Sequence, residues 1–149
     1  MIALVQRARD SRVEIGGETA GGFTGPGLVI FLGVTHSDGE KEADWLAHKC
    51  ANLRIFEDGE GKMNRSLADV GGSMLIVSQF TLYGDASRGF RPGFTAASRP
   101  EHSEPLYERF VRRCSETGIP VSTGRFGADM QVYIQNDGPV TLIVDTARR

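Results

Sequence analysis

The stretch Leu75-Ile76-Val77-Ser78-Gln79-Phe80-Thr81-Leu82-Tyr83-Gly84-Asp85 decides how the chain is organised. Its first residues are apolar and follow Gly71-Gly72, so the pattern predicts a buried strand. Ser78, Gln79 and Thr81 then supply two hydroxyls and an amide where a core strand normally continues with valine or leucine. Buried polar groups without partners cost about 1–3 kcal/mol each. Either a ligand binds there, or the strand runs out into a polar loop whose hydroxyls bond local backbone.

The length and composition of the chain indicate one domain spanning residues 1–149. With 149 residues and 40% hydrophobic content, such a domain buries roughly 70% of its unfolded surface and leaves no material for a second core. Residues 1–7 enter a strand-like pattern at once, without a signal-peptide h-region. No apolar run approaches the roughly 20 residues of a membrane span. We therefore expect a cytoplasmic protein that makes no use of a membrane.

The charge balance limits the ways in which the chain can bind nucleic acid. The formal net charge is -2, which is poor for wrapping a duplex, because such binding depends mostly on neutralised phosphates. Any nucleic-acid contact is therefore expected to be small and local. Arginine outnumbers lysine 14 to 3. This excess either provides guanidinium groups that bind phosphates in a forked geometry or reflects genomic base composition.

Cysteine and histidine give no sign of a metal site or a cofactor. Cys50 and Cys114 fall on the apolar faces of predicted helices, where free cysteine behaves as a small hydrophobe, so we expect reduced structural thiols. His36, His48 and His102 lie far apart and share no helical metal spacing, and the chain has no C-x-x-C pair. We expect neither a metal nor a cofactor.

Strands dominate the rest of the chain. Residues 1–15 read as one long strand or a bent pair of strands, broken near Asp10-Ser11 and closed by Gly16-Gly17. With the short return that leads to Gly25-Pro26-Gly27, they predict a hairpin. Residues 28–34 are apolar throughout, which predicts a core strand covered on both faces. Gly33 within it indicates a close backbone approach. Further strands are expected at residues 54–57, 121–123, 130–135 and 140–145.

Two helices interrupt these strands. The first is expected to be capped by Ser37 or Asp38 and to bury Ala43, Leu46, Ala47, Cys50 and Leu53. The second is expected to start at Ser103, with Pro105 tolerated in its first turn and Gly118 ending it. Its solvated face would carry Arg109, Arg112 and Arg113. The helices are too widely spaced for regular βαβ alternation, so the predicted class is α+β, a single domain with a mainly antiparallel, barrel-like sheet and two principal helices.

Residues 84–99 show no periodicity, and compact domains seldom leave such a length structureless without a purpose. The segment contains Arg88, Phe90, Arg91, Phe94 and Arg99. Arginine interleaved with phenylalanine suits binding of phosphates together with base stacking. The alternative is a surface loop pinned by its aromatic side chains.

The last turn is expected at Asn136-Asp137-Gly138-Pro139, between the final two predicted strands. Asn-Asp-Gly is typical of a hairpin turn. Pro139 removes a backbone donor at the head of the following strand, and only about 5–6% of X-Pro bonds in folded proteins are cis. The residues alone predict a trans bond and a structural turn.

Two segments together carry a family resemblance. Ser78-Gln79-Phe80-Thr81-Leu82 and Asn136-Asp137-Gly138-Pro139-Val140-Thr141 resemble the two signature motifs of the D-aminoacyl-tRNA deacylases, proofreading enzymes of translation. The similarity begins at Gln6-Arg7 and includes residues 54–57, 62–64, 91–95 and 123–130, so that it covers practically the whole chain. One departure is Gly93, where the family pattern has serine.

The resemblance implies hydrolysis of the ester between a D-amino acid and the terminal adenosine of tRNA, without a metal or cofactor. It also implies a homodimer in which the Gly138-Pro139 bond is cis and is inserted into the partner's site. The implied catalytic residues are Ser78, Gln79, Phe80 and Thr81, and the implied substrate-binding residues are Arg7, Met130, Asn136, Gly138, Pro139 and Thr141. Serine at position 78 favours the D-specific branch over related deacylases that remove L-alanine.

Two mechanisms remain open for such an enzyme. Thr81 is the only tempting nucleophile, but no histidine, lysine or carboxylate lies beside it in sequence, and a threonine without a base is weak. The favoured alternative is attack by water, assisted by the ribose 2′-OH, with the backbone N–H groups of Gln79, Phe80 and Thr81 holding the oxyanion.

Two further expectations concern the range of function. A site that selects only by excluding an L side chain has no means of excluding glycine, so the acceptor end of tRNA carrying glycine is an expected substrate as well. The rival class of function is a non-catalytic module that binds RNA ends, and a chain of one free-standing domain weighs against it.

Overall fold

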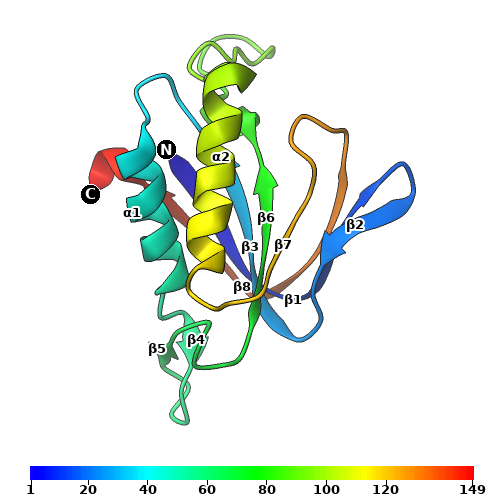
Figure 1. Cartoon of the computed structure of the whole chain (residues 1–149), viewed down its shortest axis with the longest axis vertical. Coiled ribbons are helices and arrows are strands. Elements are labelled where there is room, and N and C mark those ends of the chain that lie inside the picture. Colours follow the sequence, from blue (N-terminus) through cyan, green and yellow to red (C-terminus); the bar gives the residue numbers. More distant parts are fainter.

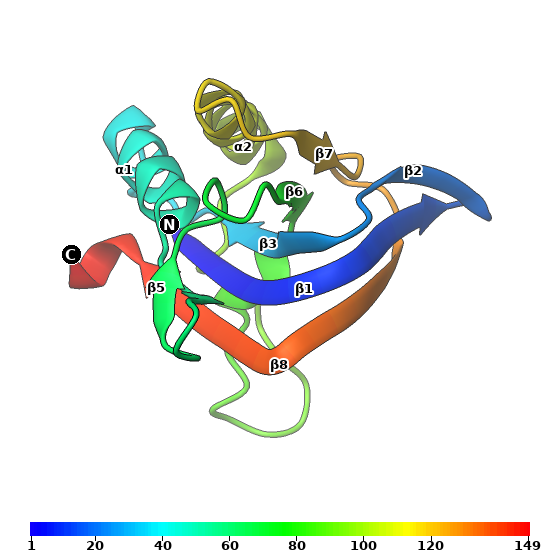
Figure 2. The ribbon, with the colours of Figure 1, turned by 90° about the horizontal axis from the view of Figure 1, so that it is seen from below.

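The strand β1 (Ile2–Ile15) organises the sheet, because it pairs antiparallel with three other strands. The structure, a computed structural model, describes residues 1–149. The remaining strands are β2 (Glu18–Gly22), β3 (Pro26–Gly33), β4 (Phe56–Glu57), β5 (Met63–Arg65), β6 (Ser73–Ser78), β7 (Val121–Thr123) and β8 (Gln131–Asp145). The helices are α1 (Glu40–Ala51) and α2 (Pro100–Ser115), with short 3-10 turns at Phe80–Tyr83 and Thr146–Arg148. Both helices lie on one side of the curved sheet (Figures 1 and 2).

The predicted α+β class, with a barrel-like sheet and two principal helices, is confirmed. The strand order is β2-β1-β3-β6-β7, with β8 on β1. The sheet is mixed, because the β3–β6 and β6–β7 pairs are parallel. The barrel nearly closes where β2 meets β7, and there the Ser122 hydroxyl donates to the Gly22 carbonyl over 2.9 Å. A Cβ at Gly21 would collide with the Thr123 carbonyl oxygen, so this approach requires glycine.

Strands β3 and β6 are covered on both faces, as the apolar run 28–34 predicted. Leu28 and Ile30 join the cluster under the helices, whereas Val29 and Leu75 join a second cluster inside the barrel. All four side chains are fully buried, and each such burial contributes about 1.5–3 kcal/mol. The close approach expected at Gly33 is also present, because the segment that follows β6 lies directly against it.

Helices α1 and α2 pack against each other and against the sheet. Cys50 on α1 and Cys114 on α2 are buried and free, as predicted. Burial raises the pKa of the Cys114 thiol to about 12, so it stays protonated and packs as a small apolar group. Neither helix has the length and the apolar character that crossing a membrane would require.

The predicted cap of α1 was wrong by one residue. Gly39 occupies the N-cap position, and its N–H donates to the Glu42 carboxylate over 3.0 Å. Ser37 does not cap the helix, and the Asp38 carboxylate instead accepts the Thr35 amide at 2.8 Å. The carboxylate of Asp38 therefore closes the turn before the helix and is not free to cap it.

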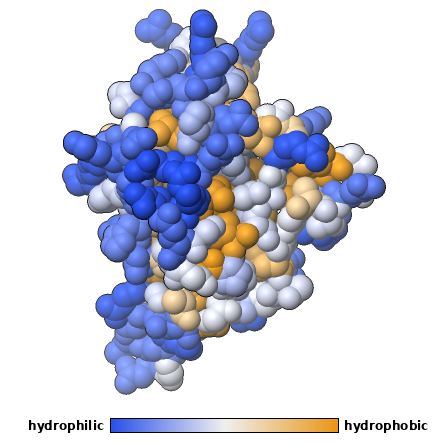
Figure 3. Space-filling model, viewed as in Figure 1, coloured by the Kyte–Doolittle hydropathy of each residue, from blue (hydrophilic) through white to orange (hydrophobic).

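The predicted start and solvated face of α2 also need correction. The helix begins at Pro100 and not at Ser103, because proline at the first helical position has its φ already set and lacks only an N–H that would be unpaired there. Arg109 and Arg113 do not simply face solvent, since both donate to Asp44 of α1, at 2.7 and 2.9 Å. Figure 3 shows the hydrophilic surface that these helices present.

The hairpin predicted at residues 136–139 is absent. Strand β8 runs without interruption, and β1 pairs with it on both sides of this segment, Ala8 with Asn136 and Gln6 with Thr141. The residues between form a bulge, because β8 has more residues there than β1. The Gly138-Pro139 bond is cis, where the residues alone favoured trans.

Candidate active site

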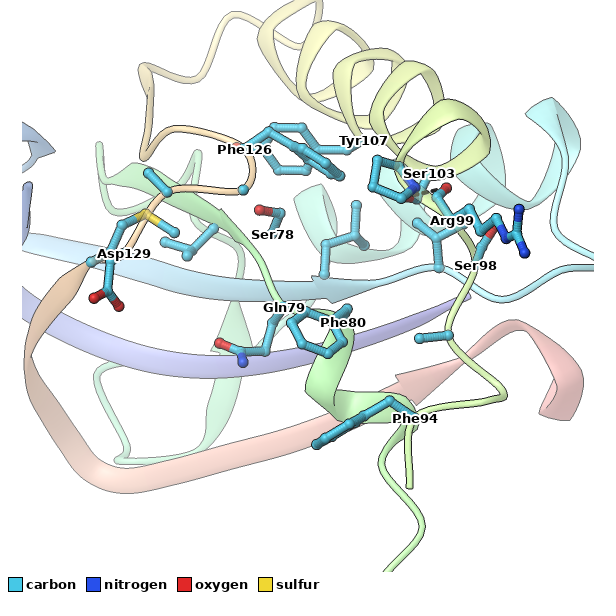
Figure 4. Close-up of a pocket in the computed structure, with 18 of the residues that line it drawn as sticks. Ser78, Gln79, Phe80, Phe94, Ser98, Arg99, Ser103, Tyr107, Phe126 and Asp129 are labelled. Carbon is cyan, nitrogen blue, oxygen red and sulfur yellow. Dashed lines mark hydrogen bonds between the residues drawn. The ribbon is translucent and has the colours of Figure 1, made fainter. Parts of the chain in front are cut away.

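A pocket of about 620 Å³ opens between the end of β6, the first turns of α2 and residues 126–130 (Figure 4). Most of its lining is apolar. Aromatic rings from four different segments contribute to the wall, namely Phe80, Phe94, Tyr107 and Phe126. A concave, mainly apolar pocket with a few polar groups is typical of a small-molecule site.

The pocket exists because β7 is shorter than β6. Strand β7 pairs with β6 only as far as Ile76, opposite Thr123, whereas β3 accompanies β6 up to Ser78. Alternation along β6 places Ser78 on the same face as Ile76, which is the helix side. Beyond the end of β7, that edge of β6 has no neighbouring strand. The Ser78 hydroxyl there points into the space below Phe126 and Tyr107 (Figure 4).

The predicted catalytic segment leaves β6 as a 3-10 turn at the pocket mouth. The Gln79 N–H donates to the Leu32 carbonyl at 2.8 Å, so the expectation that this N–H helps to hold an oxyanion is wrong. The N–H groups of Phe80 and Thr81 donate no backbone hydrogen bond. The Gln79 side-chain amide donates to the Thr81 hydroxyl. Two free backbone donors therefore lie next to a hydroxyl that is already engaged.

Few ionisable groups line the pocket. They are Arg99, Tyr107 and Asp129, so the lining contains no histidine or lysine. The Tyr107 hydroxyl donates to the Ile76 carbonyl at 2.9 Å, and burial raises its pKa to about 12. Tyr107 is therefore a neutral hydrogen-bond donor and not a base. No group of three or more metal-binding side chains is gathered anywhere in the fold.

The other predicted site residues lie outside this pocket, around the bulge of β8. Gly138 and Pro139 are exposed there. Arg7 is 6% exposed and donates from Nη1 to the Ile55 carbonyl at 2.8 Å and from Nε to the Asp137 carbonyl at 3.2 Å. This buried guanidinium fixes the bulge from the side of the protein interior.

Side-chain hydrogen bonds hold the two ends of the bulge. The Asn136 amide donates to the carbonyls of Arg7 and Val140, both at 3.0 Å. The Thr141 hydroxyl donates to the Asn136 side-chain oxygen at 3.3 Å, and Gln6 donates to both Asn136 and Thr141 at 3.3 Å. Asn136, Thr141 and Arg7 thus act as supports for the exposed Gly138-Pro139 peptide within one chain.

The structure therefore divides the predicted site residues into two groups. Ser78, Gln79, Phe80 and Met130 line the pocket, with Thr81 beside them, whereas Arg7, Asn136, Gly138, Pro139 and Thr141 belong to the bulge. Sequence reasoning missed Tyr107, which lines the pocket wall. The spacing of the buried residues 103, 107, 110 and 114 along α2 is the signal that reveals it.

Comparison with known proteins assigns this chain to a class of enzyme, the hydrolases that release amino acids from tRNA. A family model described as D-Tyr-tRNA(Tyr) deacylase matches residues 4–145. The D-aminoacyl-tRNA deacylase of Symbiobacterium thermophilum is 56% identical over 146 residues, which cover 98% of this chain and 96% of that protein. That of Thermus aquaticus is 54% identical over 149 residues, covering 100% and 97%. The chain belongs to the D-aminoacyl-tRNA deacylase family.

Solved structures show the same fold. A protein described as c-Myc DNA Unwinding Element Binding Protein superposes with a TM-score of 0.91 at 40% identity, over 98% of this chain and 99% of that one. A probable eukaryotic D-amino acid tRNA deacylase gives a TM-score of 0.76 at 17% identity, over 96% and 97%, and supports the fold alone. The predicted family is thus confirmed, and the protein is an enzyme that deacylates D-aminoacyl-tRNA.

Proposed function

We propose that this enzyme selects D-aminoacyl-tRNA by rejecting L-amino acids with the Gly138-Pro139 segment of a second copy of the chain. One observation carries the proposal. The family's two signature motifs lie apart within one chain, one in the pocket and the other on an exposed bulge outside it. A shared site in a homodimer would bring them together, with the bulge of one subunit closing the pocket of the other.

The outer side of β8 supports such an assembly. β8 pairs with β1 only, so its other edge has unpaired backbone groups. It also exposes large apolar side chains, with Leu142 at 37% and Ile143 at 68% exposure. Apolar residues on an unpaired strand edge favour association with another chain.

In this proposal, the carbonyl groups of the inserted Gly138 and Pro139 bind the substrate's α-amino group. The adjacent backbone then occupies the space that an L side chain would need, while a D side chain points out of the pocket. Selection works by rejection, so the enzyme should accept different D-amino acids and also glycine.

The proposed mechanism is attack by water with help from the 2′-OH of the terminal ribose. The Thr81 hydroxyl already accepts the Gln79 amide, and the pocket lining contains no histidine or lysine to activate it. The free N–H groups of Phe80 and Thr81 would stabilise the oxyanion. Thr81→Val should then lose less than about tenfold in rate, a modest effect beside loss of an activated nucleophile, whereas a 2′-deoxy terminal adenosine should abolish turnover. The opposite result would make Thr81 the nucleophile.

Complementation tests the shared site. Gln79→Ala damages the pocket, and Gly138→Ala damages the bulge because its Cβ would lie 2.7 Å from the Val140 nitrogen at a residue with φ +122°. Circular dichroism first checks that both variants fold. Each alone should be inactive, whereas an equal mixture that exchanges subunits should recover about a quarter of the wild-type activity, since half of the dimers have one intact site. No recovery despite exchange, followed with two affinity tags, would mean that each site is built within one chain.

The range of accepted substrates tests whether the enzyme selects by rejecting L-amino acids. Glycine, L-alanine and D-alanine are esterified to one tRNA body, and their release is followed over time. Release of D-alanine and glycine with L-alanine untouched is expected. Complete sparing of glycine on every tRNA body would require positive recognition of the D side chain and would contradict rejection as the basis of selection. Because its substrate belongs to the translation machinery, we place the enzyme in the cytoplasm.

A further inference from the structure

The loop between the 3-10 turn and α2 presents a free aromatic ring near the pocket. Phe90 is 106% exposed, so solvent surrounds the whole side chain. Phe94, four residues later, packs edge to face against Phe80 in the pocket wall, with ring centroids 5.2 Å apart. The two roles considered for the aromatic residues of this loop are therefore divided between them. Phe94 pins the loop, and Phe90 contributes nothing to holding it.

The loop that presents Phe90 is closed by regular backbone contacts. Asp85 and Gly93 exchange two hydrogen bonds, at 2.7 and 2.8 Å. The Asp85 carboxylate accepts the Ser87 amide at 2.8 Å, and Gly89 turns the chain with φ +66° immediately before Phe90. These contacts hold the ring at the tip of a projecting loop, which lies beyond the N-terminal end of α2 in Figure 1.

The charge around this ring is positive in a protein that is negative overall. Residues 84–99 contain three arginines and one aspartate, while the chain has a net charge of -2. The side chains of five of the 14 arginines make neither a hydrogen bond nor an ion pair, namely those of Arg88, Arg91, Arg99, Arg112 and Arg125. Four of these lie in the two loops that border the pocket. Arg99 lines the pocket itself, and free guanidinium groups in loops that border a pocket favour a phosphate-bearing ligand.

We propose that Phe90 is a stacking platform for an unpaired base of the tRNA 3′ end, with Arg88 and Arg91 binding the phosphates beside that base. This inference rests on the proposed function, in which the pocket takes the terminal aminoacyl-adenosine. The four residues from Phe94 to Phe90 span at most about 14 Å. A stacked strand rises about 3.4 Å per nucleotide, so the ring reaches a base within about four nucleotides of the terminal one. Stacking on an aromatic ring tolerates any base, so the platform serves tRNAs of different sequence.

Two substrates distinguish a loss of base stacking on Phe90 from damage to the pocket. One is a minihelix carrying D-tyrosine on its unpaired 3′ end, and the other is D-tyrosyl-adenosine, which lacks the upstream nucleotides. Phe90→Ala should lower kcat/KM for the minihelix by about fivefold or more, as expected for one lost base stack, and leave D-tyrosyl-adenosine unchanged. Phe90→Trp should retain the wild-type value with the minihelix. Met63→Ala is the matched control, because Met63 is 51% exposed on β5 at the other end of the molecule (Figure 1).

Two measurements report on binding directly. An amide-linked D-tyrosyl minihelix resists hydrolysis, and 2-aminopurine in place of one unpaired base should lose fluorescence on binding to the wild type but not to Phe90→Ala. Arg91→Gln should reduce the slope of log affinity against log salt by about 0.7, the value for one phosphate contact to a single strand. With so few contacts, the wild-type slope itself should be shallow.

The outcomes distinguish this inference from the proposed function. If the wild type hydrolyses both substrates and Phe90→Ala leaves both unchanged, the platform is overturned while the deacylase activity stands. Equal losses on both substrates, or a changed molar mass in light scattering, would assign Phe90 to the pocket or to a subunit contact. If the wild type hydrolyses neither substrate, the proposed function fails, and the fluorescence measurement still decides whether Phe90 stacks on a base.

Discussion

Replacing Gly33 by alanine should move the turn that carries the active-site residues. Gly33 ends β3, and a Cβ there would lie 3.1 Å from the Leu82 Cβ, 3.2 Å from the Gln79 carbonyl oxygen and 3.2 Å from a ring carbon of Tyr83. All three atoms belong to the segment that begins at the pocket. Favourable carbon contacts lie at about 3.5–4.0 Å, so this segment must retreat by several tenths of an ångström.

How far the 3-10 turn moves determines how much the substitution lowers the unfolding free energy and how much it lowers kcat. Overpacking of this kind costs about 1–3 kcal/mol. The 3-10 turn lies at the surface and can shift, which places the loss of unfolding free energy at the lower end of that range. A misplacement of about 1 Å can cost about 100-fold in rate, so a shift of 0.3–0.5 Å should lower kcat by about 4- to 10-fold.

Initial rates with D-tyrosyl-tRNA and urea unfolding measure the two effects on one preparation. Gly59→Ala is the control, because no heavy atom lies within 4 Å of its Cβ and its φ is not positive. The control should retain wild-type rate and stability. If Gly33→Ala retains the full kcat while losing stability, the turn does not transmit the displacement to the catalytic groups, and the reasoning is refuted.

Three further predictions concern stability and reactivity. Tyr107→Phe removes a hydrogen bond to a β6 carbonyl and should lower the unfolding free energy by about 1 kcal/mol in urea titrations, and no change would contradict this account. The hydrogen bond from Arg109 holds the pKa of Asp44 well below its ordinary value, so this carboxylate stabilises the fold above its unfolded pKa of about 3.9 and the benefit disappears on acidification. The urea midpoints of the wild type and Asp44→Asn should therefore differ at pH 7, and the difference should shrink progressively as the pH falls below 4, whereas a constant difference would exclude this origin. Burial raises the pKa of both Cys50 and Cys114, so neither should react with Ellman's reagent at pH 8 until urea unfolds the protein, and rapid labelling of the native state would contradict their burial.

The elements that sequence patterns predicted well are those whose environment is uniform along their length. Residues 28–34 are apolar at every position because β3 has the helix-side core on one face and the barrel interior on the other. The start of β6 follows the same rule, and its polar end at Ser78 marks the place where β7 no longer covers it. The pattern of apolar and polar residues predicts which positions are buried, and burial is what determines where both strands form.

The elements that sequence patterns predicted badly depend on distant partners. Asn136-Asp137-Gly138 is a local hairpin signal, but β1 is 14 residues long and offers pairing partners to β8 on both sides of the bulge. Those long-range hydrogen bonds outweigh the preference of the turn. The Asp38 cap failed for a similar reason, because the carboxylate also accepts the Met1 amino group at 2.5 Å, from 37 residues away. Neither partner lies within reach of a local sequence window.

The two groups of predicted site residues are positioned by neighbouring strands of one sheet. Gln6 and Arg7 on β1 support the bulge, while Gly33 on the adjacent β3 seats the turn that carries Gln79. β1 and β3 are paired along eight consecutive residues of β1, from Ile2 to Arg9, so neither strand can slide without reversing its buried face. The distance between bulge and pocket within a subunit is therefore fixed by backbone pairing and not by flexible loops. In a shared site, this rigidity would allow one subunit to hold its bulge within tenths of an ångström of the partner's substrate, which is the tolerance that chiral rejection by contact demands.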